Sequence, residues 1–109
     1  MILTKSKINY LQSKVLKSGN VKIKIVPIDD YINKRFTLIK LDVEGYEKEA
    51  LFGAKNTVKK YCPKLAICAY HYQSDLWEIP LLIKKLNSDY RLYVRHYNQY
   101  VFDTVYYGV

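Results

Sequence analysis

Hydrophobic and polar positions change their spacing several times along the first half of the chain, and each change predicts a new element. Residues 1–20 are polar and predict an irregular lead-in or a short helix. Residues 21–28 alternate between apolar and lysine positions, which predicts a half-exposed strand, and a short helix is expected at 29–32. Residues 37–43 form a short apolar run that ends in acids and Gly45, as expected of a buried parallel strand that leaves its sheet.

The middle of the chain switches from helical spacing to strand spacing and back again. Apolar positions recur with helical spacing over residues 46–58, and Pro63 predicts the end of that helix. Residues 65–70 predict a second buried strand. Residues 75–86 predict an amphipathic helix that carries Pro80 in its first turns, where a missing N–H is tolerated.

The last part of the chain predicts two strands, residues 91–97 and 104–109, with a turn near residues 98–100. Their short link permits an antiparallel hairpin but no parallel crossover. Alternating strands and helices indicate an α/β fold with a parallel sheet. We therefore predict a mostly parallel sheet with helices on its faces and an antiparallel final strand.

One stretch carries a specific pattern of acids and a glycine after a predicted strand. It reads Ile39-Lys40-Leu41-Asp42-Val43-Glu44-Gly45-Tyr46-Glu47 and is followed by Leu51-Phe52-Gly53-Ala54. Further segments match in the same order, at 28–31, 63–67, 70–71, 75–80, 95–97 and 104–107. Over residues 18–109 the chain resembles the FkbM family of methyltransferases.

The resemblance implies the C-terminal part of a Rossmann-like methyltransferase that uses S-adenosylmethionine. Family members are similar to O-methyltransferases, so the implied partner is a small-molecule hydroxyl acceptor, a sugar or a natural product. We divide the chain into a basic lead-in, residues 1–20, and a partial FkbM-like domain, residues 21–109. The family places its donor-binding glycine loop and ribose-binding acid upstream, and none of the four glycines here forms a Gly-x-Gly pair after a strand. We therefore expect the isolated chain to be inactive or incomplete.

Three polar residues are the candidate catalytic groups, because they follow predicted strands whose carboxyl ends meet at one edge of a sheet. They are Asp42, Glu44 and His71. A histidine can accept the acceptor's proton at neutral pH, and the acids can orient it, hold the substrate or act as base. The same groups could hold a hard cation such as Mg²⁺, although we assign no metal site. The structural alternatives are a Lys40–Asp42 pair, Glu44 as a helix-start residue, and His71 as a histidine at the sheet edge whose hydrogen bonds are satisfied.

The remaining candidates concern the two ligands. Asp29 follows a strand and is assigned to the adenosine part of the donor, with a helix cap as the alternative. Tyr70, Tyr72, Trp77 and His96 are assigned to the acceptor, with core packing as the alternative for the aromatic residues.

Charge and composition narrow the choice of partners and compartment. The net charge is +8, and residues 1–28 contribute +6 of it through lysines alone. Because these lysines are spread out, we expect a solvated segment and no nucleic-acid partner. No apolar run approaches the ~20 residues that a membrane span needs, and no signal-peptide core is present, so we expect a cytoplasmic protein without a membrane partner. Of the two cysteines, Cys68 is expected to be buried.

In an alternative hypothesis the chain does not catalyse a reaction. In it the chain is an α/β module that binds a partner or forms a homodimer through an open sheet edge, since unpaired edges invite strand pairing. Apolar faces left uncovered by a partial sheet would favour the same association.

Overall fold

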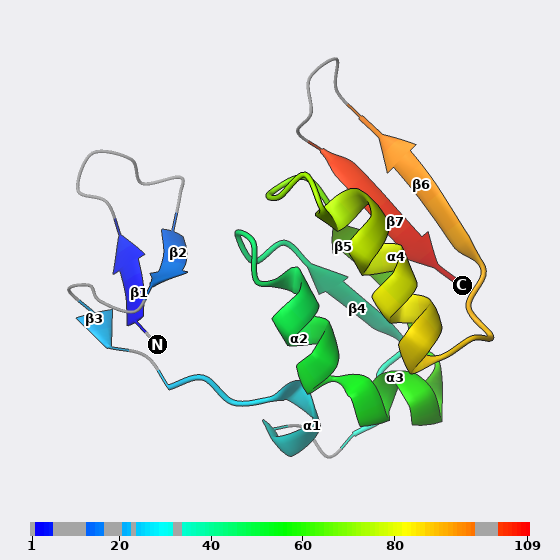
Figure 1. Cartoon of the computed structure of the whole chain (residues 1–109). Helices are drawn as coiled ribbons and strands as arrows, with labels where there is room; N and C mark the ends of the chain where they lie inside the picture. Colours follow the sequence, from blue (N-terminus) through cyan, green and yellow to red (C-terminus); the bar gives the residue numbers. More distant parts are fainter. Residues whose placement is uncertain (1, 6–12, 17–20, 23, 32–33, 98–102) are drawn as a thin grey trace.

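The computed structural model describes residues 2–5, 13–16, 21–22, 24–31, 34–97 and 103–109 (Figure 1). It contains a small antiparallel sheet and a larger mixed sheet covered by helices. The predicted turn at residues 98–100 lies outside the described residues. No helix among the described residues is long and apolar enough to cross a membrane.

The small sheet occupies the segment that was predicted to be irregular or helical. Its strands are β1 (Ile2–Lys5), β2 (Ser13–Leu16) and β3 (Val21–Lys22), in the order β2-β1-β3. The prediction of an irregular lead-in was wrong, because four-residue strands give too short an alternation to stand out in a polar segment. Pairing with a partner strand, not local pattern, defines them.

The strand predicted over residues 21–28 is reduced to the two residues of β3. Pro27 has no N–H to give to a sheet ladder. Its carbonyl accepts hydrogen bonds from the N–H groups of Asp30 and Tyr31, which start the short helix α1 (Ile28–Tyr31). The segment therefore turns into a helix where the alternation predicted an extended strand, and Ile25 and Val26 stay exposed.

The larger sheet has the order β4-β5-β7-β6 and confirms the predicted fold class. Its strands are β4 (Leu38–Leu41), β5 (Lys64–Cys68), β6 (Leu92–His96) and β7 (Thr104–Gly108). β4 and β5 are parallel, whereas β7 is antiparallel to both β5 and β6. The final strand is thus inserted between two others, so β6 runs in the same direction as β4 and β5.

Three helices pack on the sheet and on each other: α2 (Glu47–Gly53), α3 (Lys55–Tyr61) and α4 (Asp75–Leu86). In Figure 1, α2 and α4 lie in front of the strands. Burial along β4 alternates, with Ile39 and Leu41 buried and Leu38 58% exposed. The strand predicted as buried is therefore covered on one face, because the described helices cover one side of the sheet. As predicted, Cys68 is buried.

The single helix predicted over residues 46–58 is broken into α2 and α3 at Ala54. A side chain at Gly53 would lie 3.2 Å from the Cα atom of Pro27, so the backbone of the incoming segment passes directly against the break. Ala54 is buried, and its N–H bonds to the carbonyl of Leu51 instead of the carbonyl four residues back. The interruption depends on a tertiary contact that helical spacing cannot show.

α4 has the predicted bounds, but Pro80 is its sixth residue and lies beyond the first turn, where a proline removes a hydrogen bond. The carbonyl that loses its donor is that of Leu76, four residues earlier. The hydroxyl of Tyr106 on β7 donates a 2.6 Å hydrogen bond to this carbonyl. A side chain from the sheet thus replaces the missing backbone donor and attaches α4 to β7.

We expect Tyr106→Phe to lower the free energy of unfolding by about 0.5–1 kcal/mol, because the carbonyl of Leu76 loses the donor that replaces the missing N–H of Pro80. In a Pro80→Ala background the restored backbone N–H can bond to Leu76, so the same substitution should cost less. Urea denaturation of the four proteins of this cycle, followed by circular dichroism, measures the coupling. Tyr107→Phe is the matched control, since its hydroxyl contacts Tyr97; strictly additive effects of Tyr106→Phe and Pro80→Ala would contradict the coupling.

Candidate functional site

The carboxyl ends of β4 and β5 bring three of the predicted residues together. The Nε2 atom of His71 lies 3.7 Å from Oδ1 of Asp42 and 3.4 Å from Oε2 of Glu44. Both acids follow β4, and His71 follows β5, the parallel neighbour of β4. This proximity was predicted, because the carboxyl ends of parallel strands meet at one edge of a sheet. The catalytic roles remain predictions.

A fourth residue, Glu47, belongs to the same cluster and was missed as a site residue. Its side chain is 1% exposed, and its Oε1 atom lies 3.0 Å from Nδ1 of His71. Its two oxygens accept hydrogen bonds from the N–H groups of Val43 (3.0 Å) and Gly45 (3.1 Å). The sequence carried a signal, because Glu47 is the last acid of the motif, but its position in the first turn of a helix suggested only a favourable dipole interaction.

The backbone between β4 and α2 follows a strained path that aims the Glu44 side chain. Glu44 has φ = 53° and Gly45 has φ = 98°, so two consecutive residues are left-handed or nearly so. A left-handed conformation is costly for a residue other than glycine and occurs often at functional sites. The two hydrogen bonds to Glu47 lie on either side of Glu44 and hold this turn. The carboxylate–histidine cluster, Asp42, Glu44, Glu47 and His71, is thus built on a turn that Glu47 closes.

Electrostatics within the cluster differ from one acid to the next. Burial raises the pKa of the Glu47 carboxyl above its ordinary value, while backbone N–H groups and the charge of His71 act in the opposite direction. Asp42 is more exposed and accepts a 3.0 Å hydrogen bond from the Tyr70 hydroxyl. Burial, followed by this bond to Asp42, raises the pKa of Tyr70 well above its usual range.

The structural alternative for Asp42, an ion pair with Lys40, is wrong. No ion pair joins the two residues in the described part of the chain, where every ion pair of Asp42 is to His71. The reason is that β4 ends at Leu41, so Asp42 leaves the pleat and turns toward the end of β5. Tyr70 and His71 take the place that Lys40 was expected to fill.

Both ring nitrogens of His71 are buried without a hydrogen bond to a described residue, and its side chain is 11% exposed. The 3.0 Å approach of Nδ1 to Glu47 is close enough for an ion pair, but its direction does not make a hydrogen bond. The Tyr70 ring lies against the imidazole with ring centres 4.2 Å apart. Single ligand atoms of Asp42, Glu47 and His71 lie within 4.8 Å of one another, a grouping that could hold a metal ion.

Asp29 lies within α1 and caps the start of α3, a different helix from the one that it was expected to start. Its Oδ2 atom accepts from the N–H of Asn56 (2.8 Å), and its Oδ1 atom accepts from the N–H and hydroxyl of Thr57 (2.9 and 2.7 Å). Burial works against the charged form, but these hydrogen bonds outweigh it and lower the pKa of Asp29. Both oxygens are engaged with the start of α3; contact with a donor remains a prediction.

The four residues assigned to the acceptor are divided by the structure. Tyr70 touches Asp42 and His71, and the ring of Tyr72 lies over Gly45 beside the cluster. Trp77 is exposed on α4, and His96 lies on β6 with Nδ1 2.8 Å from the Thr104 hydroxyl. Among the described residues no contact joins these last two to the cluster, and all four assignments remain predictions.

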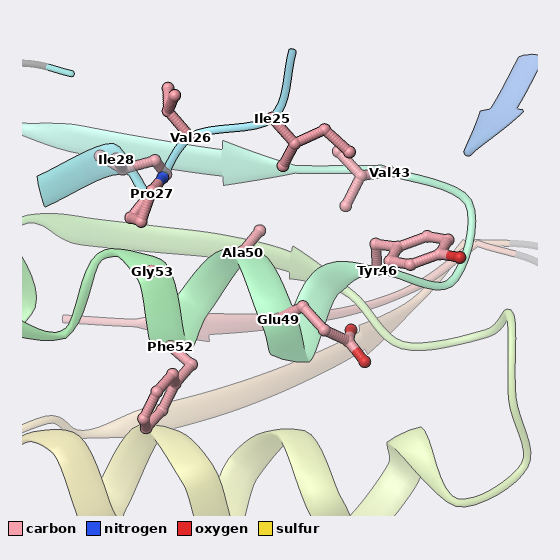
Figure 2. Close-up of a pocket in the computed structure, with 10 residues that line it drawn as sticks. All are labelled: Ile25, Val26, Pro27, Ile28, Val43, Tyr46, Glu49, Ala50, Phe52 and Gly53. Atoms are coloured by element: carbon pink, nitrogen blue, oxygen red, sulfur yellow. The ribbon is translucent and has the colours of Figure 1, made fainter. Parts of the chain in front are cut away.

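An apolar pocket of about 390 Å³ lies next to the cluster on the other side of Val43. Figure 2 shows its walls: Ile25–Ile28 on one side, and Tyr46, Glu49, Ala50, Phe52 and Gly53 from α2 and the turn before it on the other. Val43 connects the two features, because its side chain lines the pocket and its N–H bonds to Glu47. Sequence patterns missed this pocket because it forms only where residues 25–28 pass beside α2.

Comparisons with known proteins agree with the resemblance of the motif. A sequence model of the methyltransferase FkbM domain matches residues 4–101. A crystal structure of methyltransferase FkbM from Methylobacillus flagellatus KT is 41% identical, with a TM-score of 0.72, and the match covers 76% of this chain. The match spans 22% of the length of that protein. No curated protein matches the chain.

We expect Gly45→Ala to destabilise the turn, for two reasons that can be separated. The positive φ angle costs about 1–2 kcal/mol for a residue with a Cβ atom, and that atom would lie 2.7 Å from Cε2 of Tyr72. In a Tyr72→Ala background the contact is removed, so the cost of Gly45→Ala should fall to the backbone term. Urea denaturation measures the loss of unfolding free energy caused by Gly45→Ala in each background. A Gly45→Ala variant as stable as the unmodified chain would contradict the strained turn.

Proposed function

Because this chain belongs to the FkbM methyltransferase family, we propose that it forms the acceptor side of an S-adenosylmethionine-dependent O-methyltransferase. The observation that carries the proposal is the convergence of His71 with Asp42 and Glu44 at the carboxyl ends of parallel strands. Ligands of open α/β sheets bind at this edge. The acceptor in this proposal is the hydroxyl group of a small molecule, a sugar or a natural product.

Methyl transfer to a hydroxyl is an in-line displacement that needs alignment and removal of a proton. The carbon–sulfur bond of the sulfonium breaks as the carbon–oxygen bond forms, and the donor leaves as a thioether. In this proposal the hydroxyl proton passes through the partly exposed Glu44 carboxylate to Nε2 of His71, which is buried and makes no hydrogen bond to a described residue. The charged ring that results would lie beside Asp42 and Glu44, which stabilise it.

Glu47 is a positioning residue in this proposal, because it lies at Nδ1 of the imidazole, whereas Asp42 and Glu44 lie at Nε2. Its buried carboxylate holds the turn that carries Glu44 and lies 3.0 Å from Nδ1 of His71. A carboxylate behind a histidine stabilises the imidazolium that forms during proton transfer, as in the serine hydrolase triad. Tyr70 orients Asp42 through its hydroxyl.

The donor groove is assigned largely to residues outside this chain. No Gly-x-Gly pair follows a strand of the sequence, and such a turn lets the backbone approach a nucleotide cofactor. In the described structure β4 pairs with β5 on one side, so its other edge is available for a further strand of the same sheet. The chain also spans 22% of the M. flagellatus protein. We infer that residues beyond this chain complete the donor site at the edge of β4.

A second candidate function is a binding module that associates through the same edge. Leu38 on β4 is 58% exposed on the sheet face that the described helices leave uncovered, and Tyr93 on β6 is also exposed. Pairing of β4 with a second copy would satisfy its edge and cover part of this face. Analytical ultracentrifugation separates the candidates, because a concentration-dependent dimer supports the module and a strict monomer contradicts it.

We expect calorimetric titration of the isolated chain with S-adenosylmethionine to show no binding in the micromolar range. The physical reason is that the chain offers no glycine turn for the donor and engages both Asp29 oxygens in capping α3. S-adenosylhomocysteine provides the matched comparison, since it lacks the sulfonium charge. Saturable micromolar binding of either ligand would show that the donor site is complete within these residues.

We expect His71→Gln to lower kcat at least 100-fold in a chimera in which this chain replaces the matching segment of the M. flagellatus protein. The readout is formation of S-adenosylhomocysteine with a panel of sugars and natural-product alcohols. Asp89→Asn is the control, because this exposed acid lies in the loop after α4. An active chimera whose kcat is unchanged by His71→Gln would rule out a role for His71 in proton removal.

A further inference from the structure

His71 presents a problem that methyl transfer alone does not solve. Both of its ring nitrogens are buried, and neither makes a hydrogen bond within the described part of the chain. A buried polar atom without a partner is costly, and in native proteins such atoms usually have a water molecule or an ion as partner. Carboxylate oxygens of Asp42, Glu44 and Glu47 lie 3.0–3.7 Å from these nitrogens. A neutral imidazole can donate to at most one of these neighbours, and its second nitrogen then faces acceptors.

The charge of the cluster is also unbalanced. Its three acids have no ion pair with a lysine or arginine in the described part of the chain, where their only ion-pair partner is His71. Lys48, the cation next to Glu47 in the sequence, pairs with Asp75 and Glu78 instead. Glu47 is almost completely buried, and a buried acid without a compensating charge is strongly unfavourable. The cluster lacks positive charge.

Three residues of the cluster lie close enough together to share a metal ion after small side-chain movements. One ligand atom each from Asp42, Glu47 and His71 lies within 4.8 Å of the others. These contacts use both ring nitrogens: Nε2 lies 3.7 Å from Asp42 and 3.4 Å from Glu44, whereas Nδ1 lies 3.0 Å from Glu47, so an ion bound to one nitrogen draws the carboxylate beside the other toward it. Two atoms bound to one ion at about 2.0–2.1 Å lie roughly 3.3 Å apart in tetrahedral geometry. Each Glu47 oxygen accepts one backbone N–H and keeps a lone pair for a further partner.

We propose that Asp42, Glu47 and His71 bind a divalent transition-metal ion, with Glu44 beside its exposed side. One imidazole nitrogen and two carboxylates suit Zn²⁺ or Mn²⁺ better than Ca²⁺, which prefers oxygen ligands alone. The side chains of Asp42 and Glu44 are 45% and 34% exposed, so the ion keeps an open side. Open positions of this kind are typical of catalytic metal sites, whereas structural sites are closed by protein ligands.

The ion would change how the acceptor is activated, and this consequence rests on the proposed function, whereas metal binding itself does not. A hydroxyl oxygen bound at the open side loses its proton more readily. The O–H bond breaks and the proton passes to the Glu44 carboxylate. The oxygen then attacks the methyl carbon as the carbon–sulfur bond breaks. In this state His71 is a metal ligand, and Glu44 replaces it as the proton acceptor.

The test is calorimetric titration of the metal-free full chain with MnCl₂, ZnCl₂ and CaCl₂ in separate experiments. We expect one site for Mn²⁺ and Zn²⁺ with weaker binding of Ca²⁺. His71→Gln and Asp42→Asn should each weaken Mn²⁺ binding at least 10-fold, since loss of a supporting group alone costs 10–100-fold. Asp89→Asn should bind Mn²⁺ as the unmodified chain does.

Mn²⁺ is the decisive ion, because Zn²⁺ also binds exposed thiols such as that of Cys62. A second readout is the paramagnetic broadening of backbone amide signals by Mn²⁺, which should be strongest for residues 42–47 and 71. Because Glu47 holds the turn, Glu47→Gln can fail to fold and is not used; circular dichroism checks the folding of the other variants. Broadening centred elsewhere would overturn the proposal.

Absence of saturable Mn²⁺ and Zn²⁺ binding up to millimolar concentration would also overturn it, as would Mn²⁺ affinity unchanged by His71→Gln. These outcomes separate the site from the proposed function. A chimera that loses methyl transfer with His71→Gln while the chain binds no metal would refute the metal site and leave the function standing. Metal binding without methyl transfer by the chimera would support the site and count against the function.

Discussion

The buried carboxylate of Glu47 is the interaction on which the site depends. It accepts the N–H groups of Val43 and Gly45, and so it closes the turn between β4 and α2. That turn gives Glu44 its left-handed backbone, brings Gly45 under the ring of Tyr72, and places the Val43 side chain in the wall of the pocket. The same carboxylate reaches His71 from β5. One buried acid therefore links the carboxyl ends of the two parallel strands. Its oxygens accept N–H groups from the turn after β4, and one of them also lies against His71, which follows β5.

The fold could be predicted where local pattern and tertiary structure agree. The apolar runs at β4 and β5, the helical spacing of α4 and the hairpin of β6 and β7 all follow from spacing alone. The failures share one cause, which is that a distant segment decides the local structure. The backbone of Pro27 passes against Gly53 at the break between α2 and α3, and the hydroxyl of Tyr106 replaces the hydrogen bond that Pro80 removes. No periodicity within α2, α3 or α4 contains that information.

The candidate site was predictable to a similar degree. Asp42, Glu44 and His71 could be placed together because the carboxyl ends of parallel strands meet at one edge, a rule that needs only strand order and direction. Glu47 was missed because an acid in the first turn of a helix already has a sufficient local explanation. The difference between a solvated acid and a buried one lies in what covers it, and here the cover comes from the segment around His71. Burial of a charged residue is a tertiary property, so the motif could name Glu47 without revealing its function.

The sign of the charge at this edge connects the proposed metal site to the proposed methyl transfer. Three carboxylates attract a sulfonium donor, which is cationic, but they oppose the formation of an alkoxide from the acceptor. A catalytic site has to stabilise the charge that develops on the reacting oxygen, and acids alone do the reverse. Protonation of His71 supplies one positive charge, which leaves the acids in excess. A divalent ion held by Asp42, Glu47 and His71 would reduce the negative field where the oxygen binds and leave Glu44 free to accept its proton. The arrangement of acids around His71 is therefore chemically consistent with hydroxyl activation when a cation completes it.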